Sequence, residues 1–156
     1  LPAALSITIV RGVLVNIGMA IHFSYLLQGS FKIQPVIYPL TIFISAFSLA
    51  IAWYKDLPDR AGDAHFGYRT FPLLYSPKLA LYLGATFVMA AYGWCIYWSY
   101  KASESWLMYS LIVLGVAFLL HVKNVRLNEQ ASIKRFYKLF WVFFFATYIS
   151  FLLILF

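Results

Sequence analysis

The apolar segment "VIYPLTIFISAFSLAIAWY" (residues 36–54) decides the fold class, because it contains no charged side chain. A run of about 18 or more apolar residues is long enough to cross the hydrocarbon core of a membrane as a helix. The segment is followed directly by "KDLPDRAGDAHFGYRTF" (residues 55–71), which holds three of the five acidic residues in the chain. The sequence therefore joins a membrane helix to an acidic loop.

The overall composition extends this interpretation to the whole chain. Of the 156 residues, 63% are hydrophobic and 11% are charged, whereas a soluble domain carries about 25% charged residues. The apolar runs are continuous, which argues against the alternating segments of a membrane β-barrel. We predict an all-α, multi-helix transmembrane bundle with five spans, at residues 3–27, 36–54, 78–100, 104–122 and 135–156.

Positive charge is concentrated on two of the predicted connections. Residues 55–77 and 123–134, with their immediate flanks, hold most of the 12 Lys and Arg residues, whereas the other two connections hold only Lys32 and Lys101. By the positive-inside rule, the two basic connections are cytoplasmic. This placement accounts for the net charge of +7 by topology and by contact with lipid headgroups, and there is no basic stripe of the kind that binds nucleic acid.

Aromatic residues near the ends of the predicted spans form an expected interfacial belt. The belt consists of Trp53, Tyr54, Tyr75, Trp98, Tyr100, Trp106 and Tyr137.

The acidic loop carries the strongest chemical signal. Asp56, Asp59 and Asp63 follow one another at spacings of three and four, so that on a helix they lie on one face. A hard divalent cation such as Mg²⁺ relieves their repulsion, and proteins commonly hold Mg²⁺ through carboxylates together with substrate phosphates. Pro58 is expected to end or kink the preceding helix. At this point two interpretations remain open: a magnesium diphosphate site, or a solvated loop whose charges only keep it out of the membrane.

A family resemblance separates these interpretations. The stretch "KDLPDRAGDAHFGYRTF" resembles the second aspartate-rich motif of the UbiA superfamily of intramembrane prenyltransferases, in the form found in the homogentisate prenyltransferase branch. "VRGVLVNIGMAIHF" (residues 10–23) is similar to the fifth helix of that branch, and "RFYKLFWVFFFATY" (residues 135–148) to its last. The resemblance implies a nine-helix bundle, of which residues 1–156 form a single membrane domain that corresponds to helices five to nine, the C-terminal half.

The resemblance also implies a function. Enzymes of this family transfer a polyprenyl group from a prenyl diphosphate to an aromatic acceptor with the help of Mg²⁺. The expected acceptor is homogentisate, as in tocopherol and plastoquinone-type prenylquinone biosynthesis. The alternatives are another acceptor, such as chlorophyllide, hydroxybenzoate, dihydroxynaphthoate or a glyceryl phosphate, and a non-catalytic membrane fragment.

Roles for individual residues follow from matching them to the motif. The resemblance assigns the metal and the catalytic role to Asp56, Asp59 and Asp63. Lys55 and Arg69 are expected to contact the diphosphate or the acceptor. The other aspartate motif of the family, N-x-x-x-D-x-x-x-D, does not occur in this sequence. We therefore expect the chain alone to be incomplete and the N-terminal half of the same protein to supply that motif.

Three further residues are candidates for substrate binding. Arg11 lies within an apolar helix, where a charge is costly enough to suggest a function; the other interpretation is an arginine that extends to the interface. Asn16 also has two possible roles, substrate binding or packing of its helix together with Gly12 against a neighbour. Tyr68 is expected to help close the acidic loop over the substrate cavity.

Overall fold

The structure is a computed structural model that describes residues 2–155, without the side chains of residues 2, 3 and 155. Within this range it is helical, with no strand. In chain order the elements are α1 (Pro2–Ile7), the π-helix η1 (Thr8–Leu14), α2 (Val15–Gln28), α3 (Ile37–Tyr54), α4 (Asp56–His65), α5 (Phe71–Leu74), α6 (Pro77–Lys101), α7 (Ser105–Lys123), α8 (Gln130–Leu152) and the 3₁₀ turn η2 (Leu153–Leu155).

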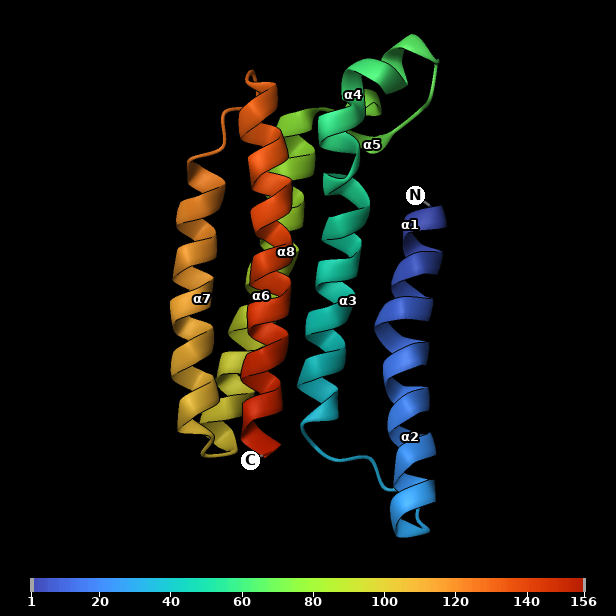
Figure 1. Ribbon diagram of the computed structural model, residues 1–156, viewed down its shortest axis with the longest axis vertical. Helices are drawn as coiled ribbons and strands as arrows, with labels where there is room; N and C mark the ends of the chain where they lie inside the picture. Colours follow the sequence, from blue (N-terminus) through green and yellow to red (C-terminus); the bar gives the residue numbers. More distant parts are fainter. Residues whose placement is uncertain (1, 156) are drawn as a thin grey trace.

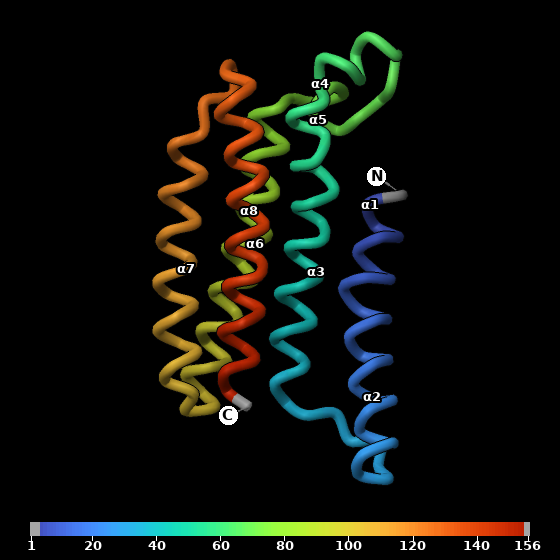
Figure 2. Tube along the Cα trace, viewed as in Figure 1, coloured from blue at the N-terminus to red at the C-terminus, as the bar shows by residue number. Residues whose placement is uncertain are grey.

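The long helices run side by side as a bundle (Figure 1). Helix α6 packs against α3 and α7, and α8 packs against α7 and α3, so these helices form one group. The segments α1, η1 and α2 make a continuous outer rod that packs mainly on α3 (Figure 2). Short α4 and α5 lie at one end of the bundle, which is also the end where α7 connects to α8 (Figure 1).

The helices match the predicted membrane spans closely. Four helical segments are long and apolar enough to cross a membrane, namely Ala4–Gln28, Ile37–His65, Pro77–Lys101 and Ser105–Lys123. They correspond to the first four predicted spans. Helix α8 is not among them, although it lies alongside them (Figure 1). The prediction of a helical membrane bundle is confirmed, and a fifth span in α8 stays a prediction.

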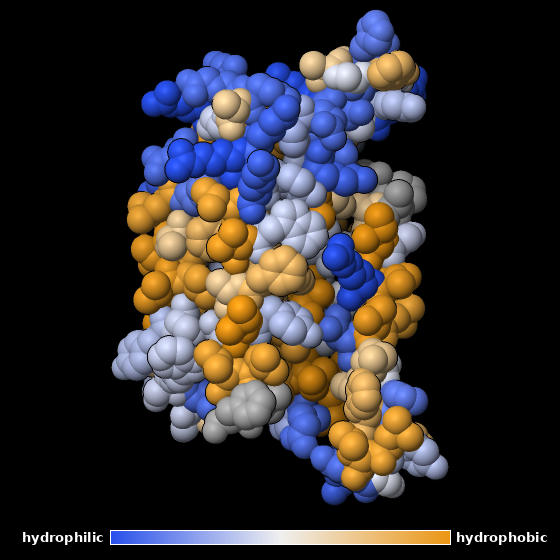
Figure 3. Space-filling view, in the orientation of Figure 1, coloured by the Kyte–Doolittle hydropathy of each residue, from blue (hydrophilic) through white to orange (hydrophobic). Residues whose placement is uncertain are grey.

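The surface polarity agrees with a protein embedded in a membrane. In the space-filling view, hydrophobic residues form a band across the middle of the molecule, and hydrophilic residues cover the end that carries α4 and the α7–α8 connection (Figure 3). Many apolar side chains, such as Val113 and Val142, are exposed. A soluble protein rarely exposes so large a continuous apolar surface to water. The chain is therefore that of an integral membrane protein.

Aromatic rings fill the interior of the group formed by α3, α6, α7 and α8. Phe47 of α3 is fully buried and stacks on Phe140 of α8, with ring centroids 4.9 Å apart. Tyr92 of α6 and Phe118 of α7 are buried beside them. Each ring buries a large apolar area and makes specific edge and face contacts with its neighbours. The interior of this group is thus tightly packed.

The last turn of α3 is fixed by Tyr54. Its side chain is 0% exposed, and its hydroxyl donates a hydrogen bond to the carbonyl oxygen of Leu81 at 2.9 Å. The ring fits only because residue 84 is glycine: a Cβ at Gly84 would lie 2.6 Å from Cε1 of Tyr54. The prediction that Tyr54 belongs to the interfacial belt is therefore wrong, and so is that for Trp53, which is also buried.

Replacing Gly84 tests this contact. We expect Gly84→Ala to destabilise the protein by about 1–3 kcal/mol, because the added methyl group overlaps the Tyr54 ring. Gly93→Ala in the same helix is the matched control, since a Cβ there meets nothing within 4 Å, and alanine favours helix over glycine. Thermal unfolding of detergent-solubilised protein measures both variants. Equal midpoints for the two variants would contradict this packing.

Candidate functional site

Helix α4 begins almost immediately after α3 ends. Lys55 is the single residue between them, and its backbone remains in the helical region, with φ −59° and ψ −33°. Pro58 has no N–H and cannot donate to the carbonyl of Tyr54, the last residue of α3. In the first turn of α4, by contrast, a missing N–H is tolerated. The predicted break at Pro58 is confirmed, and it separates the membrane helix from the acidic helix.

The three aspartates of the motif lie on this one short helix. The Asp56 side chain is 21% exposed, and its Oδ1 lies 3.9 Å from Nζ of Lys55. Asp63 is partly buried and Asp59 is exposed. Both carboxylates are close enough to act on Asp56 through their negative charges. The structure therefore places the three predicted metal ligands on one short helix that begins directly after Lys55.

This arrangement has a clear limit as a metal site. Within the described part of the chain, no group of three or more His, Cys, Asp or Glu side chains is placed to hold an ion. Carboxylates spaced along one helix face do fit a hard cation that takes its remaining ligands from phosphate oxygens. The donor chemistry thus suits a metal shared with a phosphorylated ligand, whereas it does not form a closed protein cage.

The segment after α4 turns back towards the bundle. Gly67 adopts φ +71°, and the N–H of Tyr68 donates to the carbonyl of Asp63 at 2.9 Å. The side chains of Tyr68 and Arg69 are exposed. Neither of the ion pairs found in residues 2–155 includes Arg69. Phe71, at the start of α5, stacks on Trp53 with ring centroids 5.0 Å apart and fastens the segment to α3.

A contact from α8 also holds α4. Nε2 of Gln130, the first residue of α8, donates a hydrogen bond to the carbonyl oxygen of Pro58. Gln130 was not predicted as part of the site, because the sequence pattern placed it in a loop and began the last helix at residue 135. That boundary is wrong: α8 starts at residue 130, in a polar first turn at the end of the bundle. Nothing in the local sequence marks the partner of Gln130.

The outer rod contains a π-helix around Arg11. In η1 the backbone N–H of Val15 bonds to the carbonyl of Val10, five residues earlier. The side-chain amide of Asn16 donates to the carbonyl oxygens of Arg11 at 2.9 Å and Gly12 at 2.8 Å. Such π-helical turns are frequent at functional sites. The amide of Asn16 therefore stabilises the backbone that carries Arg11.

The same turn packs closely on α3. A Cβ at Gly12 would lie 2.7 Å from the Cα of Ser45, so only glycine permits this approach. The predicted packing role of Gly12 is confirmed.

Arg11 itself extends towards α8. Its guanidinium carbon lies 5.7 Å from the ring centroid of Trp141, within the range of a cation–π interaction. No hydrogen bond or ion pair found in the described residues joins Arg11 or Asn16 to α4. The structure thus places the two substrate-binding candidates of the outer rod apart from the aspartates. Trp141 was not predicted as their neighbour, since it looks like one more aromatic residue in an apolar helix.

Comparison with known proteins gives a consistent result. Residues 2–148 match the UbiA prenyltransferase family. The chain is 32% identical over 153 residues to a homogentisate phytyltransferase of Synechocystis sp., covering 94% of this chain and 49% of the relative. It is 29% identical over 158 residues to homogentisate phytyltransferase 1 of Arabidopsis thaliana, covering 96% and 39%.

A relative named for a different acceptor is almost equally similar. Coumarin 8-geranyltransferase 1 of Citrus limon is 30% identical over 155 residues, covering 94% of this chain and 37% of the relative. The chain thus spans half or less of the length of these curated relatives. No solved structure matches it.

The hydrogen bond from Gln130 can be tested without an activity assay. Gln130→Glu keeps the shape of the side chain and removes its N–H donors, so α4 loses one tie to α8. Since one hydrogen bond contributes about 1 kcal/mol, we expect amide hydrogens of residues 56–65 to exchange about fivefold faster in hydrogen–deuterium exchange. Gln34→Glu, at the opposite end of the bundle, is the control. Unchanged exchange in α4 would show that the bond does not restrain this helix.

Proposed function

The chain belongs to the UbiA prenyltransferase family, and on this premise we propose that the full-length protein transfers a prenyl group from a prenyl diphosphate to homogentisate. One observation carries the proposal: three carboxylates share the short helix α4, beside the Lys55 ammonium, at a polar end of a membrane bundle. The relatives named homogentisate phytyltransferase support the choice of acceptor. Because this chain spans about half of such proteins, the N-terminal half is expected to contribute the other aspartate motif.

The acidic helix is proposed to hold the diphosphate through a divalent metal, which we take to be Mg²⁺. Asp56, Asp59 and Asp63 would bind the ion, whose role when bound is to neutralise charge on the departing diphosphate. Lys55 and Arg69 would donate hydrogen bonds to the remaining phosphate oxygens. Electrostatic stabilisation of this kind commonly contributes more to catalysis than any other single effect.

The acceptor is proposed to lie nearer the outer rod. Arg11 supplies a positive charge within an apolar region, which suits the carboxylate of homogentisate. Asn16 keeps the Arg11 backbone in place, and Tyr68 is proposed to cover the site from the loop after α4. When the allylic C–O bond of the donor ionises, diphosphate leaves with the bonding electron pair. The electron-rich ring of the acceptor then attacks the carbocation, and the attacked ring carbon loses its proton, which restores aromaticity. The apolar surroundings keep water away from that cation.

The aspartate helix is proposed to face the cytoplasm. The α3–α6 and α7–α8 connections lie at the same end of the bundle (Figure 1). Together with the adjoining turns of α6, α7 and α8, they carry nine of the 12 Lys and Arg residues. Positive charge of this kind is retained on the cytoplasmic side during membrane insertion.

A second acceptor class can be compared directly with the first. The similarity to a coumarin 8-geranyltransferase favours a phenolic ring without a free carboxylate as the alternative acceptor. Assays with homogentisate and with a hydroxycoumarin, each with the same prenyl diphosphate, distinguish the two acceptor classes.

Removing the carboxylates tests the proposed reaction. In the full-length protein, Asp56→Ala combined with Asp59→Ala is expected to lower the rate of prenyl transfer to homogentisate at least ~100-fold, because the diphosphate loses its electrostatic anchor. Chelation of divalent metal from the wild-type protein should have the same effect. Glu104→Gln, at the other end of the bundle, is the control. Full activity in the double variant would refute the metal-site assignment.

Arg11 can be separated from the aspartates by kinetics. We expect Arg11→Gln to raise the KM for homogentisate about tenfold, equivalent to ~1.4 kcal/mol, while the KM for the prenyl diphosphate stays the same. Lys32→Gln removes a charge outside the site and should change neither constant. A rise confined to the KM for the prenyl diphosphate would show that Arg11 binds the donor and not the acceptor.

A further inference from the structure

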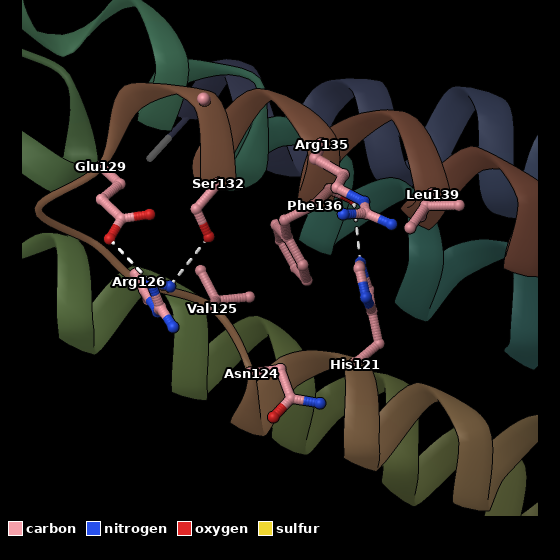
Figure 4. Close-up of a pocket in the computed structure, with 10 residues that line it drawn as sticks. His121, Asn124, Val125, Arg126, Glu129, Ser132, Arg135, Phe136 and Leu139 are labelled. Carbon is pink, nitrogen blue, oxygen red and sulfur yellow. Dashed lines mark hydrogen bonds and ion pairs between the residues drawn. The ribbon is translucent and has the colours of Figure 1, made fainter.

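A polar pocket lies between the end of α7 and the beginning of α8. It has a volume of about 570 Å³, and its walls include His121, Asn124, Arg126, Glu129, Arg135 and Phe136. None of its lining residues belongs to α4. Figure 4 shows Arg135 and His121 at one end of the pocket, with Arg126, Glu129 and Ser132 grouped at the other. The pocket is therefore a separate feature from the proposed prenyl-transfer site.

The two guanidinium groups of the pocket differ in their partners. Nη1 of Arg126 lies 3.0 Å from Oε1 of Glu129, so these charges largely offset each other. The backbone N–H of Arg126 donates to Oγ of Ser132 at 3.0 Å, which fixes the connection against the first turn of α8. Arg135 is in neither of the ion pairs found within residues 2–155. The pocket consequently keeps a net positive charge, carried by Arg135.

Apolar groups line the pocket beside Arg135, at the same end (Figure 4). The His121 ring stacks on Phe136, with centroids 5.2 Å apart and planes inclined by 20°, and it also lies 5.7 Å from the ring of Phe143. Leu139 continues this wall along α8 (Figure 4). From here both helices run into the hydrophobic band of the molecule (Figure 3). A positive charge and an apolar wall are thus found together where the hydrophilic end of the molecule meets the hydrophobic band (Figure 3).

We propose that this pocket binds the phosphate group of an anionic membrane phospholipid. Arginine pairs with phosphate through parallel hydrogen bonds, and Arg135 and the amide of Asn124 both line the pocket. Lys123, Lys134 and Lys138 are not lining residues, but each is adjacent in sequence to one, and they add the positive potential that attracts an anionic leaflet. The acyl chains of the lipid lie along the apolar surface of α7 and α8. A soluble phosphate has no acyl chain and cannot make this contact.

Binding of phosphatidylglycerol to the full-length protein in detergent tests the proposal. Native mass spectrometry counts bound lipids during a titration and gives an apparent Kd. Arg135→Gln is expected to weaken binding about tenfold. Lys134→Gln removes the same charge from the adjacent residue outside the pocket, and we expect it to change the Kd less than twofold. Glu129→Gln frees Arg126 from its partner and should tighten binding severalfold.

The gain from Glu129→Gln matters because misfolding cannot produce it, and thermal unfolding of each variant checks its stability. Equal losses for Arg135→Gln and Lys134→Gln would overturn the proposal in favour of general surface attraction. Equal affinity for phosphatidylcholine and phosphatidylglycerol would overturn it as well. In a third arm, inorganic phosphate is titrated alone. If it binds in an Arg135-dependent manner while phosphatidylglycerol does not, the ligand is a soluble anion and the lipid assignment is wrong.

Discussion

The packing of the Tyr54 ring against Gly84 is the contact on which the placement of the acidic helix depends. It locks the last turn of α3 to α6 at a position where no side chain larger than hydrogen fits on α6. The hydrogen bond from the Tyr54 hydroxyl to the carbonyl oxygen of Leu81 holds the far end of the side chain against α6. Because only Lys55 separates this turn from α4, the direction in which the aspartates leave the membrane follows from how Tyr54 is held.

Two other contacts support α4 from different sides. Gln130 binds it to the first turn of α8, and Phe71 fastens the returning segment to Trp53. All three supports come from helices of the bundle, whereas the carboxylates themselves remain at least partly exposed. This division suits a site that must bind a charged ligand at a fixed place, since rigid elements position functional groups more precisely than loops do.

The outer rod carries two polar side chains, Arg11 and Asn16, within a mostly apolar segment. A π-helical turn disturbs the regular pattern of backbone hydrogen bonds, and unpaired carbonyl groups are costly in a membrane. Asn16 adds side-chain hydrogen bonds to two carbonyl groups of this turn, and Gly12 lets the turn approach α3 closely. The result is that Arg11 is held near Trp141 of α8, a helix that the rod otherwise hardly touches.

The sequence by itself determined the membrane helices, the separation of strongly basic from weakly charged connections, the helical spacing of Asp56, Asp59 and Asp63, and the break before Pro58. These features depend on the residues within one segment: on the length of an apolar run, on a charge count, or on the missing N–H of a proline. Only the tertiary structure decided that Tyr54 is buried, that Arg11 meets Trp141, and that Gln130 reaches Pro58, a residue 72 positions away. Such contacts depend on how the helices pack against one another, because a residue's partner on a neighbouring helix leaves no trace in its own local pattern.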